Sequence, residues 1–352
     1  MSRFLKENYI KLEAYTPGEQ PKDGEYVKLN TNESPFPPAP EVVNLLNCSD
    51  IERLRLYCDP TSSKLKESLA QLYSVKPQNI FLSNGSDDIL NFAMMAFSGK
   101  GAVFPDITYG FYPVFAELHG VPFEEIPLDE DFSVNPNDYK NKNKLIFIAN
   151  PNAPTGKVLP LCDIEEILST NPDSVVVVDE AYVDFGGETS LPLIDKYDNL
   201  LVVRTYSKSR SMAGARLGYA FADESLIEDL EKIKYSTNPY NINSLTAALG
   251  AKTAECEDYY REKCRVIAEV REYTAEKLTE MGFEVLPSKA NFIFAKSDKV
   301  SGEELYLKLK ERKILVRHFT KERIKDFNRI TIGTKEQMDI LIESIREIIK
   351  EK

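Results

Sequence analysis

Short apolar segments alternate with longer segments of helical spacing through the first two thirds of the chain. The apolar segments are predicted strands, and they lie at residues 79–83, 101–104, 145–149, 175–178 and 200–204. Between them apolar residues recur every three to four positions, and the first such helix is expected to begin near Ser62. The four consecutive valines at 175–178 favour a strand that is buried on both faces. This alternation predicts a doubly wound α/β fold with a mostly parallel central sheet.

The last third of the chain has a different order of elements. Helical patterns dominate residues 222–280. The sequence then predicts a strand at 290–295, a helix at 301–312, strands at 314–317 and 329–332, and a terminal helix. That order is typical of a smaller α+β domain. The first 40 residues carry turn signals rich in proline and glycine, which favour an extended arm. We therefore expect an N-terminal arm (1–40), a large domain (41–250) and a small C-terminal domain (251–352).

Composition and charge narrow the classes of protein to which the chain can belong. Its 352 residues are 42% hydrophobic, and its net charge of −12 argues against nucleic acid or an anionic membrane as a partner. No apolar run approaches the ~20 residues that cross a bilayer. The N-terminus has no signal-peptide core, so a cytoplasmic location is expected. The five cysteines and two histidines lack metal-ligand spacing, so we expect no metal site.

One lysine follows a predicted buried strand and stands among hydroxyl side chains. Lys208 comes just after the strand at 200–204, within Tyr206-Ser-Lys-Ser, and Arg216 follows eight positions later. A lysine amine can form a Schiff base with an aldehyde. Hydroxyl groups and an arginine can hold a phosphate. Because pyridoxal 5′-phosphate (PLP) carries both an aldehyde and a phosphate, this segment predicts PLP as the cofactor.

A carboxylate directly follows the four valines. Asp179 ends that predicted strand, and Tyr182 lies three residues further on. A buried carboxylate is costly unless it is paired. The protonated pyridine nitrogen of PLP would be such a partner, and this pairing makes the ring an electron sink. Tyr182 would then donate a hydrogen bond to the phenolic oxygen of the cofactor. The simpler interpretation of Asp179 is that its side chain caps the next element.

Three further loops follow predicted strands. The segment Asn84-Gly-Ser-Asp-Asp88 would bind phosphate through the N–H groups of a helix N-terminus, or serve as an ordinary turn and cap. The segment Asn150-Pro-Asn-Ala-Pro-Thr-Gly156 is a rigid turn that could aim an amide at the cofactor. Tyr109 could stack on a planar ring, although aromatic side chains are more often part of a core. Because functional groups gather beyond the carboxyl ends of parallel strands, the loops together favour one shared site.

Two arginines lie in or beside the short strands of the last third of the chain. Arg317 ends one of these strands and Arg329 begins another. Arginine binds carboxylate or phosphate through two parallel hydrogen bonds. Surface salt bridges are the alternative explanation for each arginine taken alone.

Seven segments, taken together, match one family of enzymes. They are Leu12-Glu-Ala-Tyr-Thr-Pro-Gly-Glu-Gln-Pro21, Lys28-Leu-Asn-Thr-Asn-Glu-Ser-Pro-Phe-Pro-Pro38, Asn84-Gly-Ser-Asp87, Asp179-Glu-Ala-Tyr-Val-Asp-Phe185, Tyr206-Ser-Lys208, Pro239-Tyr-Asn-Ile-Asn243 and Arg329-Ile-Thr-Ile-Gly-Thr334. These segments run along nearly the whole chain and resemble fold-type-I PLP-dependent aminotransferases, and more narrowly the histidinol-phosphate aminotransferases. The resemblance implies a large domain with a mostly parallel sheet, a smaller α+β C-terminal domain and an N-terminal arm.

The resemblance also implies a role for each matching residue around the cofactor. Lys208 would carry the cofactor and shuttle the proton, and Asp179 would pair with the pyridinium. Tyr182 would bond the phenolic oxygen, and Tyr109 would stack on the ring. The residues expected around the cofactor phosphate are Ser86, Asp87, Thr205, Ser207 and Arg216.

Substrate binding and assembly follow from the same resemblance. The residues expected to form the substrate pocket are Tyr15, Asn32, Arg317 and Arg329. Tyr57 would reach the cofactor phosphate of the neighbouring subunit, which implies a homodimer with shared active sites.

One position departs from the family pattern. The family usually has asparagine immediately before Pro-Thr-Gly, where its amide meets the phenolic oxygen of the cofactor. Here that position is Ala153, and Asn152 precedes it. Either Asn152 takes over the cofactor contact through a local shift, or the contact is missing.

The implied reaction is an amino transfer in histidine biosynthesis. Histidinol phosphate, a phosphorylated amino alcohol, and 2-oxoglutarate would be interconverted with imidazole-acetol phosphate and glutamate. An aromatic-amino-acid aminotransferase and a PLP-dependent decarboxylase of a phosphorylated amino acid are alternatives, because they would share the cofactor residues. A non-catalytic PLP-fold protein is a third, against which the presence of both Lys208 and Asp179 argues.

Overall fold

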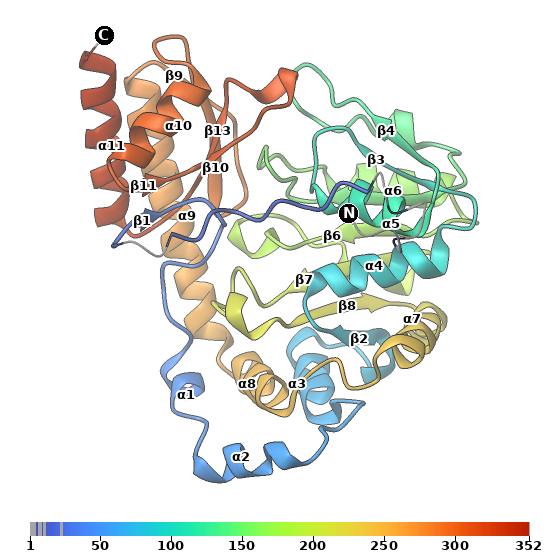
Figure 1. Ribbon diagram of the computed structural model, residues 1–352. Coiled ribbons are helices and arrows are strands. Elements are labelled where there is room, and N and C mark those ends of the chain that lie inside the picture. Colours follow the sequence, from blue (N-terminus) through green and yellow to red (C-terminus); the bar gives the residue numbers. More distant parts are fainter. Residues whose placement is uncertain (1–4, 6–8, 10–11, 22–23, 352) are drawn as a thin grey trace.

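The described residues fold around three β-sheets, of seven, four and two strands (Figure 1). The computed structural model describes residues 5, 9, 12–21 and 24–351; the rest of the predicted arm (1–4, 6–8, 10, 11, 22 and 23) and residue 352 lie outside the described residues. Among the described helices, none has the length and apolar character needed to cross a membrane.

The large sheet has the strand order β2-β8-β7-β6-β5-β3-β4. Its strands are β2 (Ile80–Ser83), β3 (Ala102–Pro105), β4 (Phe123–Ile126), β5 (Leu145–Ala149), β6 (Val176–Asp179), β7 (Leu200–Thr205) and β8 (Gly218–Ala222). Each pairs with its neighbours in parallel except β8, which is antiparallel to both β7 and β2. The predicted mostly parallel sheet is therefore confirmed. The sequence pattern did not predict β4, because two glutamates interrupt its apolar signal at the edge of the sheet.

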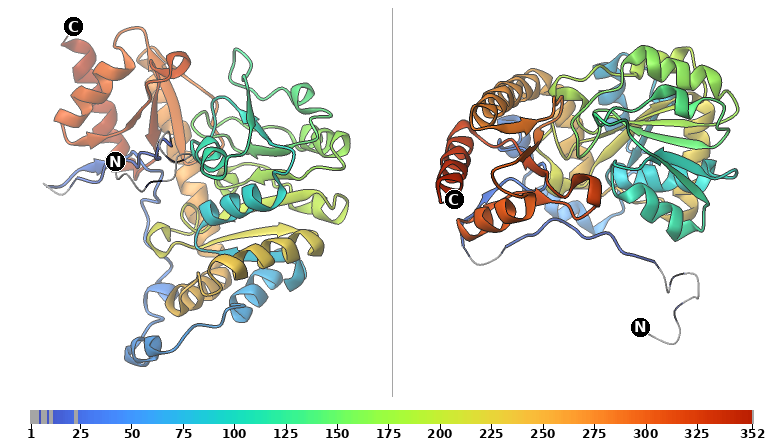
Figure 2. Two further views of the ribbon diagram at one scale, coloured as in Figure 1. Left: turned by 45° about the vertical axis from the view of Figure 1, so that its right-hand side comes forward. Right: turned by 90° about the horizontal axis from the view of Figure 1, so that it is seen from above.

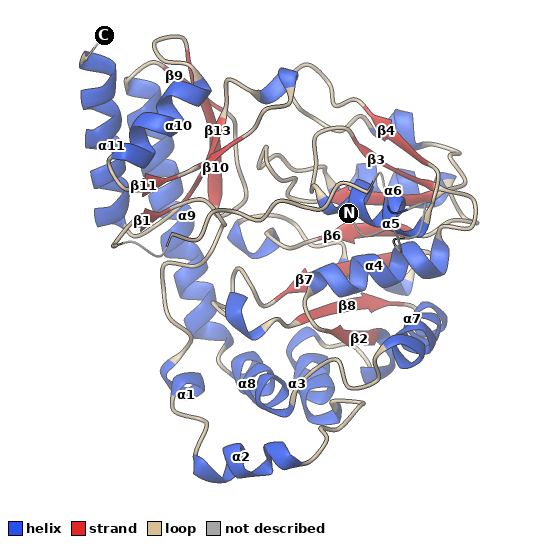
Figure 3. Ribbon diagram, viewed as in Figure 1, coloured by secondary structure: helices blue, strands red, loops and turns tan. Residues whose placement is uncertain are grey.

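Helices cover both faces of the large sheet (Figure 3). One face packs against α4 (Ser86–Phe97), α5 (Phe111–His119) and α7 (Glu224–Thr237), and the other against α3 (Ser63–Tyr73), α6 (Leu161–Thr170) and α8 (Ser244–Glu255). Because successive side chains of a strand point to opposite faces, Val177 joins the first core while Val176 and Val178 join the second. The consecutive valines therefore reflect burial on both sides.

The four-stranded sheet carries the second core. Its order is β12-β13-β10-β9, with β9 (Phe283–Val285), β10 (Phe292–Ser297), β12 (Arg317–His318) and β13 (Asn328–Thr331). The helices that pack with it are α9 (Glu257–Glu280), α10 (Gly302–Glu311) and α11 (Lys335–Lys350). In α11, Met338, Leu341, Ile342, Ile345 and Ile348 form one buried stripe at helical spacing.

The strand predicted at 314–317 is divided in the structure. Its first part, β11 (Ile314–Leu315), pairs in parallel with β1 (Val27–Lys28) of the N-terminal segment. Its second part, β12, pairs instead with β13. The predicted arm is thus tied to the C-terminal third of the chain at β1.

A long helix connects the two larger sheets. The 24-residue helix α9 extends from the helices beside the large sheet to the small sheet (Figures 1 and 2). The short helices are α1 (Pro40–Val43) and α2 (Cys48–Glu52), with 3₁₀ turns η2 (Arg53–Arg55), η3 (Pro77–Asn79), η4 (Pro136–Tyr139), η5 (Val183–Phe185), η6 (Leu191–Asp195), η7 (Ala213–Ala215) and η8 (Glu322–Ile324). The division into an arm (1–40), a large domain (41–250) and a small domain (251–352) stays a prediction.

Candidate active site

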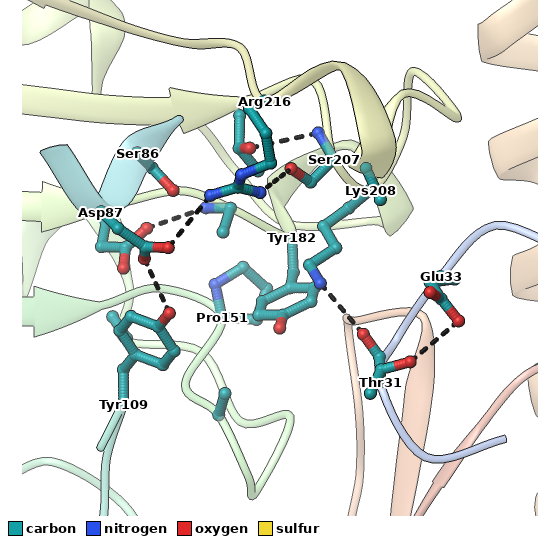
Figure 4. A pocket seen from close by; sticks show the side chains of 16 residues that line it. Thr31, Glu33, Ser86, Asp87, Tyr109, Pro151, Tyr182, Ser207, Lys208 and Arg216 are labelled. Atoms are coloured by element: carbon teal, nitrogen blue, oxygen red, sulfur yellow. Dashed lines mark hydrogen bonds and ion pairs between the residues drawn. The ribbon is translucent and has the colours of Figure 1, made fainter. Parts of the chain in front are cut away.

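Loops that follow five strands of the large sheet meet at one pocket (Figure 4). The strands are β2, β3, β5, β6 and β7, whose carboxyl ends lie at the same edge of the sheet because they run in the same direction. The predicted residues that line the pocket are Ser86, Asp87, Tyr109, Asp179, Tyr182, Thr205, Ser207, Lys208 and Arg216.

Lys208 points its amine into this pocket. Its Nζ donates a hydrogen bond to the backbone oxygen of Thr31, 3.1 Å away, in the segment after β1. Burial, and after it the charge of the nearby Arg329, lowers the pKa of Lys208 to about 8. A larger fraction of the amine is therefore neutral near pH 7 than for an ordinary lysine, and the neutral form is the nucleophile.

Asp179 lies at the carboxyl end of β6 and is buried. Its Oδ2 accepts a hydrogen bond from the Tyr112 hydroxyl at 3.0 Å, and its Oδ1 accepts one from the Ala181 backbone N–H at 3.2 Å. Burial raises the pKa of Asp179 to about 6, although both hydrogen bonds act to lower it. Within the part of the chain that the structure describes, no cation pairs with this carboxylate.

The N-terminus of α4 forms another wall of the pocket. Gly85 precedes it with φ of 92°, and no described side chain caps the first N–H groups. Arg216 reaches the same place, with Nη2 3.2 Å from Asp87 Oδ2 and Nη1 3.5 Å from Ser207 Oγ. A Cβ on Gly218 would lie 2.4 Å from the Gly85 carbonyl carbon, so β8 and α4 approach closely only because position 218 is glycine. Free helix N–H groups beside an arginine suit an anion.

Two tyrosines line the space between Lys208 and α4. The Tyr109 hydroxyl donates to Asp87 Oδ1 at 2.7 Å, which fixes the ring beside the pocket. The Tyr182 hydroxyl accepts a hydrogen bond from Asn32 Nδ2 at 3.0 Å, so the N-terminal segment meets the loop after β6. Burial raises the pKa of both phenols, which therefore stay protonated at neutral pH.

A second cavity adjoins the first and contains three of the four predicted substrate residues, Tyr15, Arg317 and Arg329, together with Tyr109. Tyr15 stacks on Phe111 with ring centroids 4.1 Å apart. Arg317 and Arg329 donate to the backbone oxygens of Thr16 and Asn30, and the buried Arg329 Nε has no partner among the described residues. Neither arginine pairs with a described carboxylate, so both remain available to an anion.

The structure does not bring Asn152 into the pocket. Its Oδ1 accepts from Thr108 at 2.9 Å, and its Nδ2 donates to the Ile107 oxygen and to Thr155. A buried amide needs such partners, and here all of them belong to the loops after β3 and β5. Ala153, not Asn152, lines the pocket, so the side-chain shift that would let Asn152 meet the cofactor is absent.

Tyr57 lies away from this pocket. Its side chain is 85% exposed and stacks on Tyr240 with ring centroids 4.6 Å apart. Within one chain, Tyr57 does not line the pocket.

Three pocket contacts were not foreseen from the sequence. Tyr112 binds Asp179, Thr31 accepts from Lys208, and Glu33 lines the pocket beside Thr31 (Figure 4). Thr31 and Glu33 fall within the segment Lys28–Pro38 already singled out, but their contacts, like that of Tyr112, depend on pairings between distant parts of the chain. Spacing along the sequence carries no signal for such pairings.

Comparison with known proteins assigns the chain to a family. The model of the family described as aminotransferase class I and II matches residues 24–345. The chain belongs to the class I and II aminotransferases. A curated relative, the histidinol-phosphate aminotransferase of Brachyspira hyodysenteriae, is 50% identical over 353 residues, which cover 99% of this chain and 100% of the relative. The predicted aminotransferase family and enzyme class are therefore confirmed.

Solved structures confirm the predicted fold of this aminotransferase. The histidinol-phosphate aminotransferase of Sinorhizobium meliloti in complex with pyridoxal-5′-phosphate has a TM-score of 0.84 at 24% identity, covering 92% of this chain and 91% of that one. The L-threonine-O-3-phosphate decarboxylase of Porphyromonas gingivalis has a TM-score of 0.78 at 21% identity, covering 92% and 99%. Because a transferase and a decarboxylase share the fold, the fold alone does not decide the reaction.

Proposed function

We propose that this aminotransferase uses PLP to interconvert histidinol phosphate and 2-oxoglutarate with imidazole-acetol phosphate and glutamate, as a step of histidine biosynthesis. The observation that carries the proposal is the 50% identity to a histidinol-phosphate aminotransferase across 99% of the chain. The pocket supports it independently, because a lysine amine of lowered pKa, a buried carboxylate and the N-terminus of α4 meet there.

The walls of the pocket fit PLP. The buried Asp179 carboxylate would pair with the pyridinium nitrogen, which supplies the cation that the described residues do not. The N–H groups of α4 with Ser86, Asp87, Thr205, Ser207 and Arg216 would surround the phosphate. Tyr109 would lie against the ring, and Tyr182 would donate to the phenolic oxygen. When bound, PLP supplies an electron sink that stabilises negative charge at the amine-bearing carbon of the substrate.

Lys208 would perform two tasks in this site. Its Nζ would hold the cofactor covalently and, once the substrate amine has displaced it, move a proton from the amine-bearing carbon. The lowered pKa suits both tasks, since each requires the neutral amine. The hydrogen bond to the Thr31 oxygen would orient Nζ from the N-terminal segment.

Arg317 and Arg329 would bind the anionic end of either substrate. One substrate carries a phosphate and the other a carboxylate, and paired guanidinium groups can bind both. The unpartnered Nε of Arg329 supports this role. Tyr15 would close the cavity from the N-terminal segment, and Asn32 would hold Tyr182 in place.

We also propose a homodimer in which Tyr57 reaches the cofactor phosphate of the neighbouring subunit. The support is a run of exposed apolar side chains around it at Val43, Ile51, Leu54 and Leu56. Monomeric proteins seldom expose such patches unless they bind a partner. The net charge of −12 disfavours nucleic acid as a partner. The cytoplasmic location stays a prediction.

A half-reaction assay tests the proposed substrate. Histidinol phosphate is added to the purified PLP-loaded protein without 2-oxoglutarate, and the visible absorbance of the cofactor is followed. We expect conversion to pyridoxamine phosphate and recovery of the original spectrum when 2-oxoglutarate is added. Conversion by phenylalanine but not histidinol phosphate would favour an aromatic aminotransferase, whereas carbon dioxide released from O-phosphothreonine would favour a decarboxylase.

A further inference from the structure

A fully buried tyrosine supports the carboxylate at the base of the pocket. Tyr112, the second residue of α5, is 0% exposed, and its hydroxyl donates to Asp179 Oδ2 at 3.0 Å. It is the one described side chain that hydrogen-bonds this carboxylate; the other bond comes from the Ala181 backbone. The position of Asp179 relative to the pocket therefore depends on where α5 packs.

The ring of Tyr112 is held on three sides. It stacks on Phe147 of β5 with centroids 5.0 Å apart and packs against Phe104 of β3 at 5.8 Å. It also meets the Tyr109 ring edge to face at 5.7 Å. Packing of this kind fixes a side-chain rotamer, so the Tyr112 hydroxyl has little freedom to leave Asp179. The same residue touches both the carboxylate below the pocket and the tyrosine beside it.

Charged groups surround Asp179, so it matters that its side-chain hydrogen-bond donor, the Tyr112 phenol, is neutral. Asp87 of α4 and Glu180 on the same loop oppose its ionisation, but Asp87 is paired with Arg216 and Glu180 with Arg204. The titratable groups that share the pocket are Tyr109, Tyr182, Lys208, Arg216 and Glu33. Burial keeps the pKa of Tyr112 well above its usual range, so its phenol stays protonated. A neutral phenol favours the ionised carboxylate without cancelling its charge, whereas a cation at this position would compete with the pyridinium.

We propose that Tyr112 is a positioning residue that keeps Asp179 ionised and aimed at the ring nitrogen of PLP. The inference rests on the proposed cofactor and is independent of which amine is the substrate. Tyr112 itself lines neither the pocket that would hold the cofactor nor the second cavity. It acts on the cofactor through Asp179.

Cofactor binding by the apoprotein tests this role without any measure of turnover. Tyr112→Phe keeps the ring stack and removes the hydroxyl, and Tyr139→Phe is the matched control. Tyr139 is equally buried, and its hydroxyl has no partner among the described residues. We expect the Kd for PLP to rise by about 10- to 100-fold in Tyr112→Phe, the value of a hydrogen bond to a charged group, and to stay within about twofold in Tyr139→Phe.

An analogue of PLP with carbon in place of the ring nitrogen tests whether the Tyr112 hydroxyl acts on that nitrogen. Wild-type protein should prefer PLP to the analogue, and this preference should shrink about tenfold or more in Tyr112→Phe. An equal loss for both ligands would show that the hydroxyl acts through packing alone, and would overturn the proposal. Failure of the wild-type chain to bind PLP at all would instead overturn the proposed function.

The pH dependence of binding gives a second signature. Wild-type affinity for PLP should weaken as the pH falls through about 6, where the Asp179 carboxyl takes up a proton. Loss of the donor raises that pKa, so the midpoint should move to higher pH in Tyr112→Phe. An unchanged midpoint would overturn the proposal.

Two further variants separate positioning from stability. In an Asp179→Asn background, Tyr112→Phe should have no further effect on PLP affinity, because the group through which it acts is gone. Phe147→Leu removes a ring that Tyr112 stacks on and keeps the hydroxyl, so it should lower Tm and leave the preference for the ring nitrogen intact. A preference lost equally in Phe147→Leu would assign the effect to packing.

Discussion

The amine of Lys208 is charged in water, but its surroundings in the folded chain favour the neutral form. Burial is the main cause, and Arg329 and Arg216 add to it by repulsion. Such a group costs folding stability and is retained for its chemistry. Lys208 should therefore lower the stability of the apoprotein measurably.

Replacement of this lysine should stabilise the apoprotein at neutral pH. The pKa of Lys208 is about 8 in the folded chain against 10.5 in the unfolded one, so the unfolded state binds more protons between these values. Wild-type stability should then rise as the pH increases from about 8 to 10.5, and Lys208→Met should lack this rise. At pH 7 the variant should be more stable by about 2–3 kcal/mol in urea denaturation.

The control for this comparison is Lys100→Met, which alters an exposed lysine. It should follow the wild-type dependence on pH. A stability difference between Lys208→Met and wild type that stays constant from pH 7 to pH 10 would contradict the assignment.

Between elements, the pocket depends on two close contacts that the chain makes around Lys208. One is the approach of β8 to the N-terminus of α4 at Gly218 and Gly85. The other is a cluster of buried charges below the loop after β7. There Asp184 of η5 accepts from Ser209 and lies 3.6 Å and 3.7 Å from Arg204 and Arg210.

Gly218→Ala should damage the phosphate end of the pocket. The added Cβ would lie 2.4 Å from backbone atoms of Gly85 and Ser86, so α4 and β8 must separate. We expect a loss of about 1–3 kcal/mol in the free energy of unfolding, together with weaker binding of inorganic phosphate and PLP. Gly99→Ala is the control, since a Cβ there meets nothing within 4 Å. Equal affinity for PLP in Gly218→Ala and wild type would refute this.

Asp184→Asn should destabilise the loop that carries Lys208. Among the described carboxylates, the substitution leaves Arg210 paired with Glu257 and Arg204 paired with Glu180. Because Asp184 is only partly buried, we expect a loss of about 1–3 kcal/mol, between the values for exposed and for buried ion pairs, measured by urea denaturation. Glu343→Gln, which breaks the exposed pair with Arg346, should change stability by less than about 1 kcal/mol. A loss at Asp184 no larger than at Glu343 would argue against the cluster as a support.

For the whole molecule, the proposed homodimer makes a prediction that one chain cannot satisfy. Lys208 lines the pocket of its own chain, whereas Tyr57 is exposed, stacks on Tyr240 and does not line that pocket. If the sites are shared, each site takes Lys208 from one subunit and Tyr57 from the other. Lys208→Ala and Tyr57→Ala then remove the contributions of different subunits. A mixed dimer then holds one site in which both residues are intact.

Co-expression of the two variants should restore activity that each lacks alone. Purification through two different tags isolates the mixed dimers, in which one of the two sites is intact, so amino transfer should reach about half of the wild-type value. The Lys208→Ala/Tyr57→Ala double variant mixed with Lys208→Ala should remain inactive. Activity no greater than the sum of the separate variants would exclude a shared site of this kind.

Local sequence patterns predicted much of the fold and the centre of the site. The strands at 145–149 and 200–204, the helix after Ser62 and the buried valines follow from the spacing of apolar residues, because strand and helix periods are local properties. Lys208 and Asp179 were found for a related reason. Each directly follows such a strand, and the ends of parallel strands must meet at one edge of the sheet.

Tertiary packing decided the contacts that link distant segments. Asn152 turns to Ile107, Thr108 and Thr155 because its buried amide needs partners, and Ala153 faces the pocket instead. The strand at 314–317 divides because β1 and β13 pair with different halves of it.

The sequence by itself determined which residues meet at the pocket, since their positions at strand ends follow from local periodicity. Only the tertiary structure decided which groups hold them: Tyr112 on Asp179, Thr31 on Lys208 and Asn32 on Tyr182. Each of these contacts joins segments that lie far apart along the chain. Their geometry depends on how whole helices and strands pack, and the spacing of neighbouring residues does not encode it.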